Sequence, residues 1–126
     1  MKLKTNQSAP NFKLESTDGN VFELNKIKKK NIILYFYPKD DTPGCTLESK
    51  DFSKLNSMIN KKNTVVFGIS KDNMESHLKF KKKFKVLFQL LSDEKVLVQK
   101  RYGVWGPKSF MGKKFMGTIR STIVIN

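Results

Sequence analysis

The segment Pro38–Glu48, PKDDTPGCTLE, contains the only cysteine of this 126-residue chain. Thr42 is a favourable helix N-cap, Pro43 suits the first helical position, and an apolar repeat follows Cys45. We therefore expect Cys45 in the first turn of a helix, where unpaired N–H groups and the positive end of the helix dipole stabilise a thiolate. Cysteines at such positions have pKa values of about 3.5–7.5 instead of about 8.5. The pattern predicts a reactive thiolate; the alternative is a small buried hydrophobe.

Arginine is the second unusual residue type in the chain. All but two of the 25 basic residues are lysines, and the exceptions are Arg101 and Arg120. A planar, permanently charged guanidinium suits a site that binds two oxygens, or an oxygen and a sulfur. Arg120 lies in IRSTIVI, a predicted strand in which it points away from Ile119 and Ile123, and it is a candidate site residue. The alternative is a surface position, which is what we expect for Arg101 in a predicted helix.

Other titratable residues near the cysteine in sequence are weaker candidates. Asp40 and Asp41 precede it closely, and because a nearby negative charge disfavours a thiolate, we expect both carboxylates to face solvent. The only histidine, His77, lies in a predicted amphipathic helix with nothing to orient it as a base for Cys45, so we expect no catalytic role for it. Glu48 most simply favours the start of the helix.

Apolar patterns around these residues predict alternating strands and helices. An Asp-Gly turn joins the first two strands, and Ile32–Tyr37, apolar on both faces, predicts a central strand. The predicted strands and short apolar segments are Phe12–Glu15, Val21–Leu24, Ile32–Tyr37, Thr64–Ser70, Val86–Leu91 and Ile119–Ile125. Three helices are predicted. The first begins near Thr42 and has the apolar repeat Leu47, Phe52, Leu55 and Ile59, the second spans Asn73–Lys85, and the third runs from Ser92-Asp93-Glu94 to about Tyr102. Single helices between strands indicate an α/β fold with a mostly buried sheet.

The segment Gly103–Gly117 is rich in glycine and predicts a loop. It also carries Trp105 and the mostly apolar residues from Phe110 to Met116. These side chains either border the site at Cys45 or form an apolar loop packed over the core.

The composition is that of one folded domain, with 38% hydrophobic residues and ten phenylalanines. The N-terminal residues MKLKTNQSAP lack the apolar run of a secretory signal, and the longest apolar stretch, residues 32–37, is too short to span a membrane. We therefore expect a cytoplasmic protein without a membrane partner. A single cysteine excludes an internal disulfide and a multi-cysteine metal site.

The formal net charge of +14 is large for a chain of this length. Such a charge attracts polyanions at low salt, so a basic nucleic-acid-binding or chaperone-like module is the alternative function. The lysines are spread along the whole chain, however, and the densest run, Lys79–Lys85, predicts an amphipathic helix with its lysines in water. We therefore do not expect a nucleic-acid partner.

The segment around the cysteine resembles the peroxidatic motif of peroxiredoxins, in which Pro38, Thr42 and Cys45 occupy the motif positions Pro-x-x-x-Thr-x-x-Cys. The form Thr-Pro-Gly-Cys-Thr is similar to the branch of the bacterioferritin comigratory protein and peroxiredoxin Q. The resemblance covers essentially the whole chain. Further matching segments are Ala9–Phe12, Tyr35–Pro38, Phe67–Ser70, Leu91–Asp93, Tyr102–Gly106, Ser109–Lys113 and Arg120.

This resemblance implies a single thioredoxin-like domain over residues 1–126 with a central mixed sheet, and a thioredoxin-dependent peroxidase that reduces hydrogen peroxide and organic hydroperoxides. Cys45 would attack the peroxide and become a sulfenic acid. Thr42 would hydrogen-bond the thiolate and peroxide, Gly44 would offer its N–H, and Pro38 would shield the sulfur. Arg120 would hold the thiolate and polarise the O–O bond. No cofactor or metal is expected, and the protein is expected to be a monomer or weak homodimer.

Two departures from the family pattern stand out. Many relatives in this branch carry a resolving cysteine five residues after the first, and this chain has Lys50 there. Resolution would then need an external thiol, from thioredoxin, glutaredoxin or glutathione. The sequence ends at Asn126, whereas relatives continue into another strand and a C-terminal helix, so these two elements are expected to be absent.

Overall fold

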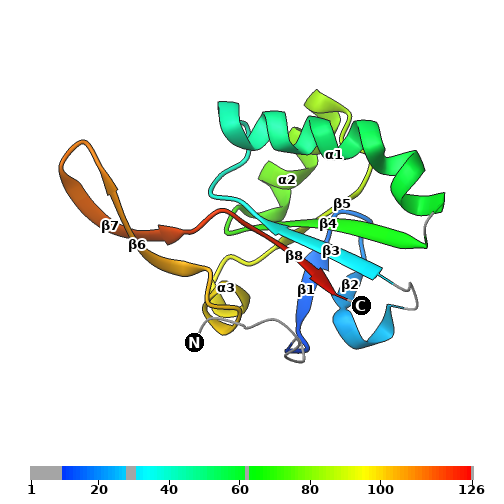
Figure 1. Ribbon diagram of the computed structural model, residues 1–126, viewed down its shortest axis with the longest axis horizontal. Helices are drawn as coiled ribbons and strands as arrows, with labels where there is room; N and C mark the ends of the chain where they lie inside the picture. Colours follow the sequence, from blue (N-terminus) through cyan, green and yellow to red (C-terminus); the bar gives the residue numbers. More distant parts are fainter. Residues whose placement is uncertain (1–9, 28–30, 62, 126) are drawn as a thin grey trace.

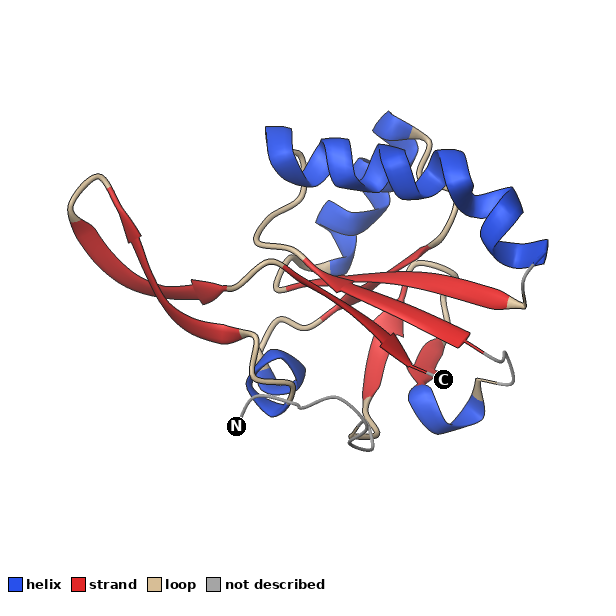
Figure 2. Ribbon diagram, in the orientation of Figure 1, coloured by secondary structure: helices blue, strands red, loops and turns tan. Residues whose placement is uncertain are grey.

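The computed structural model describes residues 10–27, 31–61 and 63–125, which form an α/β structure around a mixed sheet (Figure 1; Figure 2). Six strands hydrogen-bond in the order β2-β1-β5-β4-β3-β8. They are β1 (Lys13–Ser16), β2 (Val21–Glu23), β3 (Asn31–Phe36), β4 (Thr64–Ser70), β5 (Gln89–Ser92) and β8 (Ser121–Ile125). The three central strands β3, β4 and β5 are parallel, and β8 pairs antiparallel with β3. The predicted α/β class, the first hairpin and the central strand are confirmed.

The two long helices, α1 (Pro43–Lys61) and α2 (Met74–Phe84), cover the same face of the sheet (Figure 1). Helix α1 joins β3 to β4, and α2 joins β4 to β5. Both connections step across the sheet in the same direction, and because parallel crossovers are right-handed, both helices fall on one face. The segment between the carboxyl end of β3 and the start of α1 therefore lies at the sheet edge where α/β proteins place their ligands.

The opposite face is covered by the short helices η1 (Leu24–Lys26) and α3 (Leu97–Arg101). The sheet separates two apolar clusters, one for each face. The cluster under α1 and α2 contains Tyr35, Tyr37, Val66, Phe80, Val86, Phe88 and Leu90. The other contains Phe12, Phe22, Leu24, Ile32, Leu34, Phe36, Phe67, Ile69, Leu91, Val98, Tyr102 and Val104. Within the described ranges, no helix combines the length and apolarity that a membrane span needs.

The buried side of α1 differs from the predicted apolar repeat. Leu47 and Leu55 are exposed, and the residues that face the sheet include Ser49, Phe52 and Ser53. The hydroxyls of Ser49 and Tyr35 lie 2.7 Å apart, and Ser53 Oγ accepts a hydrogen bond from the backbone N–H of Leu87. Small hydroxyl side chains can therefore be buried here because polar partners meet them. The side chain of Ile59, the last member of the predicted repeat, lies outside the described part of the structure.

The helix predicted from Ser92-Asp93-Glu94 begins later than expected. Helix α3 starts at Leu97, after Val96 in the left-handed conformation (φ 59°). The Asp93 carboxylate accepts hydrogen bonds from the backbone N–H groups of Val98 and Gln99. Asp93 therefore satisfies the helix start from a preceding turn instead of lying in the first turn.

The predicted glycine-rich loop is a β-hairpin of β6 (Trp105–Phe110) and β7 (Lys113–Thr118) that projects from the body of the molecule (Figure 1). Its two turn residues, Met111 and Gly112, both have positive φ, as a two-residue hairpin turn of type I′ requires. Phe115 and Met116 are exposed, so they are not packed over the core. The Phe110 side chain lies outside the described residues.

Gly68 in β4 is the point of closest packing between the sheet and its neighbours. A Cβ at this position would lie 2.7 Å from Tyr35 Oη and 2.8 Å from Leu90 Cδ2. We expect Gly68→Ala to lower the free energy of unfolding by about 1–3 kcal/mol, because both neighbours are buried and cannot move freely. Urea unfolding followed by circular dichroism measures this; an unchanged midpoint would show that the core relaxes around the new methyl group.

Candidate functional site

The structure places Cys45 at the start of α1, as predicted. The helix begins at Pro43, and the carbonyl of Thr42 accepts the first helical hydrogen bond, from the N–H of Thr46 at 2.8 Å. Thr42 is therefore the N-cap, and Cys45 is the third residue of the helix. The backbone N–H groups of Gly44 and Cys45 belong to the first turn, which has no intrahelical acceptor for them. The side chains of Cys45 and Glu48 lie outside the described part of the structure, so the backbone alone locates the thiol.

The hydroxyl of Thr42 has a partner within its own loop. It donates a hydrogen bond to the Lys39 carbonyl at 2.9 Å, which closes a turn over residues 39–42. In this arrangement the lone pairs of the hydroxyl oxygen, and not its proton, are available to a substrate. Donation to a thiolate would require rotation of this hydroxyl, so its predicted role stays a prediction.

Arg120 comes to this region through strand pairing. Ser121 is the first residue of β8 and pairs with Phe36, the last residue of β3. Arg120 therefore precedes the strand instead of lying inside it, and its backbone lies beside the segment that leaves β3 at Tyr37 and Pro38. Its side chain is exposed. The pairing of β3 with β8 brings the candidate arginine to the end of the strand that leads to Cys45.

Pro38 lies where the chain leaves the sheet. The N–H of Tyr37 still donates to the Ile69 carbonyl at 3.1 Å, so the ladder with β4 continues for one residue beyond β3. Pro38 follows directly, is half-buried, and has no N–H to donate to the ladder or to a ligand. This position is compatible with the shielding role that the resemblance implies.

A depression of about 350 Å³ lies at the start of α1. The ammonium group of Lys50 lies 5.4 Å from the centre of the Phe84 ring and forms part of this surface. The depression can admit a small substrate or part of a partner molecule. Its lining residues are Asp41, Thr42, Thr46, Leu47, Lys50 and Phe84.

The two aspartates before Thr42 have different environments, and the prediction is correct for only one. Asp41 is exposed and forms an ion pair with Lys83 at 2.8 Å. Asp40 is 5% exposed, and its carboxylate lies 2.8 Å from Nδ1 of His77. The expectation that Asp40 faces solvent is wrong, because a buried histidine on α2 and the hydroxyls of Tyr37 and Ser76 are hydrogen-bond partners of its carboxyl group. The expectation that His77 lacks an orienting group is also wrong, because Asp40 contacts its ring. The only feature of the sequence that could have pointed to this pair is that the chain has a single histidine.

Asp40, Asp72 and His77 are the one group of side chains in the described ranges with the composition and spacing of a metal site, with ligand atoms within 4.8 Å of one another. Each of these atoms already has a hydrogen-bond partner. Asp72 Oδ2 accepts from the Asp40 N–H and from the Ser70 hydroxyl, and His77 Nδ1 faces Asp40 Oδ2. The group is satisfied without a cation, and we infer no metal site from it.

A cysteine in the first turn of a helix that follows a central strand, on a mixed sheet with both long helices on one face, defines a thiol enzyme on a thioredoxin-like scaffold. The scaffold matches solved structures closely. A cysteine mutant of Xylella fastidiosa PrxQ superposes with a TM-score of 0.86 at 31% identity, over 98% of this chain and 77% of that chain. The Xanthomonas campestris bacterioferritin comigratory protein superposes with a TM-score of 0.84 at 32% identity, over 90% and 73%.

The sequence comparisons name the family. Residues 5–126 match the AhpC/TSA family, and the chain belongs to this family of peroxiredoxins, in the branch of the bacterioferritin comigratory protein and peroxiredoxin Q. It is 48% identical to a peroxiredoxin bcp of Helicobacter pylori J99, over 99% of this chain and 82% of that protein. It is 40% identical to peroxiredoxin Bcp of Bacillus subtilis, over 100% and 80%. The protein is accordingly a thiol peroxidase, which decides against the alternative of a basic binding module.

A further solved structure bears on the number of cysteines. The yeast mitochondrial 1-Cys peroxiredoxin superposes with a TM-score of 0.83 at 27% identity, over 98% of this chain and 62% of that chain. In that protein the thiol is resolved via the glutathione and thioredoxin systems.

Proposed function

We propose that this protein reduces hydrogen peroxide and organic hydroperoxides with Cys45 as its only catalytic thiol and with a thiol from another molecule as reductant. The observation that carries the proposal is the position of the chain's single cysteine in the first turn of α1. The thiolate sulfur attacks the distal peroxide oxygen, the O–O bond breaks, and the other oxygen leaves and is protonated to water or an alcohol. Cys45 is left as a sulfenic acid.

The surrounding groups act on the charge that moves during this step. The N–H groups of Gly44 and Cys45 stabilise negative charge at the helix start, and the guanidinium of Arg120 stabilises the thiolate and polarises the O–O bond. The hydroxyl of Thr42 orients the peroxide, and Pro38 limits the access of water to the sulfur. The position of Arg120 beside the end of β3 and that of Thr42 at the helix N-cap support these assignments.

The second half of the reaction needs a partner. A thiol attacks the sulfenic sulfur and releases water, which leaves a mixed disulfide at Cys45; a second thiol then releases the Cys45 thiolate and a disulfide product. Lys50 occupies the position where many relatives of this branch carry a second cysteine, and no other cysteine exists in the chain. The yeast 1-Cys peroxiredoxin, whose thiol is resolved via the glutathione and thioredoxin systems, supports the same route here. We further propose a cytoplasmic location, where such reductants are abundant.

Intact-mass measurement tests this route. With one equivalent of hydrogen peroxide and no reductant, we expect the monomer to gain one oxygen and to react with a sulfenate reagent, because no internal thiol can consume the sulfenic acid. Added glutathione or thioredoxin should convert this species to a mixed disulfide at Cys45 and then restore the thiol. The proposal fails if the oxidised protein is chiefly a Cys45–Cys45 covalent dimer that reductants turn over at the rate of the overall reaction.

A further inference from the structure

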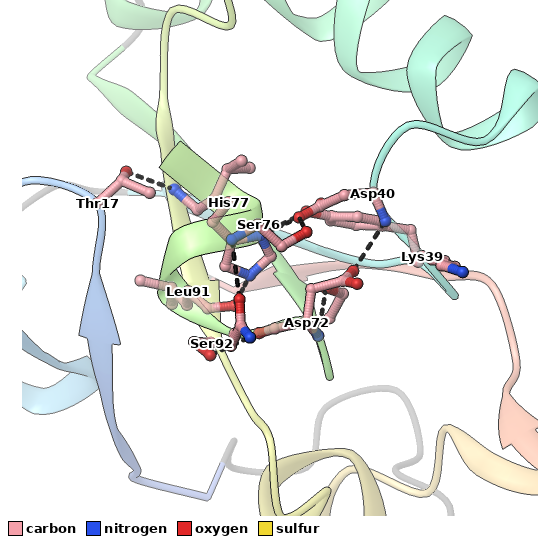
Figure 3. A network of polar contacts seen from close by, with 12 residues as sticks. Thr17, Lys39, Asp40, Asp72, Ser76, His77, Leu91 and Ser92 are labelled. Carbon is pink, nitrogen blue, oxygen red and sulfur yellow. Dashed lines mark hydrogen bonds and ion pairs between the residues drawn. The ribbon is translucent and has the colours of Figure 1, made fainter. Parts of the chain in front are cut away.

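Asp40, in the loop that leads from β3 to α1, forms a buried pair with His77 of α2 (Figure 3). His77 is fully buried in α2. Its Nε2 lies 2.9 Å from the carbonyl oxygen of Leu91, and its Nδ1 lies 2.8 Å from Asp40 Oδ2. A carbonyl oxygen only accepts, so Nε2 carries a hydrogen and donates it. Whether the second ring nitrogen, Nδ1, carries a hydrogen therefore depends on its partner, Asp40.

Both oxygens of the Asp40 carboxyl group accept hydrogen bonds from hydroxyl groups. Its Oδ1 accepts a hydrogen bond from the Tyr37 hydroxyl at 2.6 Å, and its Oδ2 accepts one from the Ser76 hydroxyl at 2.9 Å. Burial, and then the charge of Asp40, raise the pKa of Tyr37 well above its ordinary value, so this phenol remains a donor. One hydrogen then lies between His77 Nδ1 and Asp40 Oδ2, and whichever of the two atoms holds it, the pair carries no net charge.

Asp40 is also held through its backbone. Its N–H donates to Oδ2 of Asp72 at 2.8 Å, and Asp72 in turn accepts from the hydroxyl of Ser70, the last residue of β4. Hydrogen bonds from the residue after β3, from the loop after β4 and from α2 therefore converge on Asp40. The titratable groups around the pair include Tyr37 and Asp72, which hydrogen-bond to Asp40, and the charged residues that line one surface depression with it, Asp41, Glu75, Lys79 and Lys83.

The convergence matters because Asp40 lies two residues before the helix N-cap. Asp41 has a positive φ of 58°, so the chain turns sharply at this residue. The Thr42 hydroxyl donates to the Lys39 carbonyl across that turn. The carbonyl of Thr42 then accepts the first hydrogen bond of α1. A displacement of Asp40 would thus be passed on to Thr42 and to the first turn that contains Cys45.

We propose that Asp40 and His77 are positioning residues for the nucleophile: the pair holds residues 39–42, and with them Thr42 and the start of α1, while His77 partners a carboxyl group buried in the loop that leads to Cys45. This inference rests on the proposed role of Cys45 as the reactive thiolate. Removal of the imidazole leaves the Asp40 carboxyl group buried without its ring partner, and negative charge there disfavours a second negative charge at the start of α1. Removal of both groups takes that charge away.

Three variants of the full chain separate these effects: Asp40→Asn, His77→Asn, and the two combined. The measurement is the rate of alkylation of Cys45 by iodoacetamide as a function of pH, which does not depend on peroxide chemistry. Tyr102→Phe is the matched control, because it removes a buried hydroxyl bond, to the Pro10 carbonyl, within the cluster on the other face of the sheet. Thermal unfolding of each variant is recorded in parallel.

For His77→Asn we expect a higher alkylation midpoint and a rate at pH 7 that is about threefold to tenfold lower. Asp40→Asn keeps the size of the side chain and its acceptor for Tyr37, so we expect a loss of about twofold or less. In the double variant the midpoint should return to that of Asp40→Asn, because the uncompensated charge is gone. A purely structural role would lower the melting temperature and leave the midpoint in place.

The inference is overturned if folded His77→Asn has the wild-type alkylation midpoint, or if its rate falls only as much as that of Tyr102→Phe. If His77→Asn does not fold, Ser76→Ala takes its place, because it removes one donor to Asp40 from a partly exposed position. A midpoint shift in the same direction supports the inference, and an unchanged midpoint overturns it. Failure of wild-type Cys45 to form a sulfenic acid would instead reject the proposed function.

Discussion

Peroxide reduction should fall by roughly 10⁴-fold or more in Cys45→Ser, with the fold retained, because a serine hydroxyl is not ionised at neutral pH and cannot become a sulfenic acid. The chain has no second thiol that could replace the nucleophile. Consumption of hydrogen peroxide with dithiothreitol in excess measures the loss, and circular dichroism reports the fold.

Asp51→Ser is the matched control, since it introduces the same side chain at an exposed position of the same helix. It should keep wild-type activity. Residual activity above about one tenth of wild type in Cys45→Ser would mean that the observed peroxidase activity does not come from this thiol.

The second large effect is expected at Arg120. Arg120→Lys keeps the charge and loses the planar pair of donors, so we expect single-turnover oxidation of Cys45 to slow by about 10²-fold. Arg101→Lys is the matched control: it changes the only other arginine, which donates to the Asn11 carbonyl from the other face of the sheet. Stopped-flow mixing with hydrogen peroxide measures both rates.

Thr42→Val tests the oxidation of Cys45 through a second side chain assigned to this step. It removes a hydroxyl at nearly constant volume, and we expect a loss of about 10-fold to 10²-fold. Thr122→Val, at an exposed position of β8, makes the same chemical change away from the helix start. Should Arg120→Lys and Thr42→Val both oxidise at the wild-type rate, the roles assigned to these two side chains would be wrong.

Local sequence determined most of the scaffold and the position of the thiol. The N-cap Thr42 and Pro43 predict the start of α1, and the apolar segments predict β3 and β4. These predictions succeed because helix capping and strand patterns depend on residues that are close together in the sequence. The same reasoning located Cys45 in the first turn. The hairpin of β6 and β7 was missed because its turn residues, Met111 and Gly112, are not the usual Asn-Gly or Asp-Gly pair.

Tertiary structure alone decided which distant residues lie beside the segment that leads from β3 to α1. Arg120 reaches the end of β3 only through the pairing of β3 with β8, a contact between segments far apart in the chain. Asp40 and Asp41 are chemically identical neighbours, yet one is buried against His77 and the other pairs with Lys83 near solvent. Whether a carboxylate can be buried depends on a compensating charge brought by another element, and no pattern within the loop encodes where α2 will place its histidine.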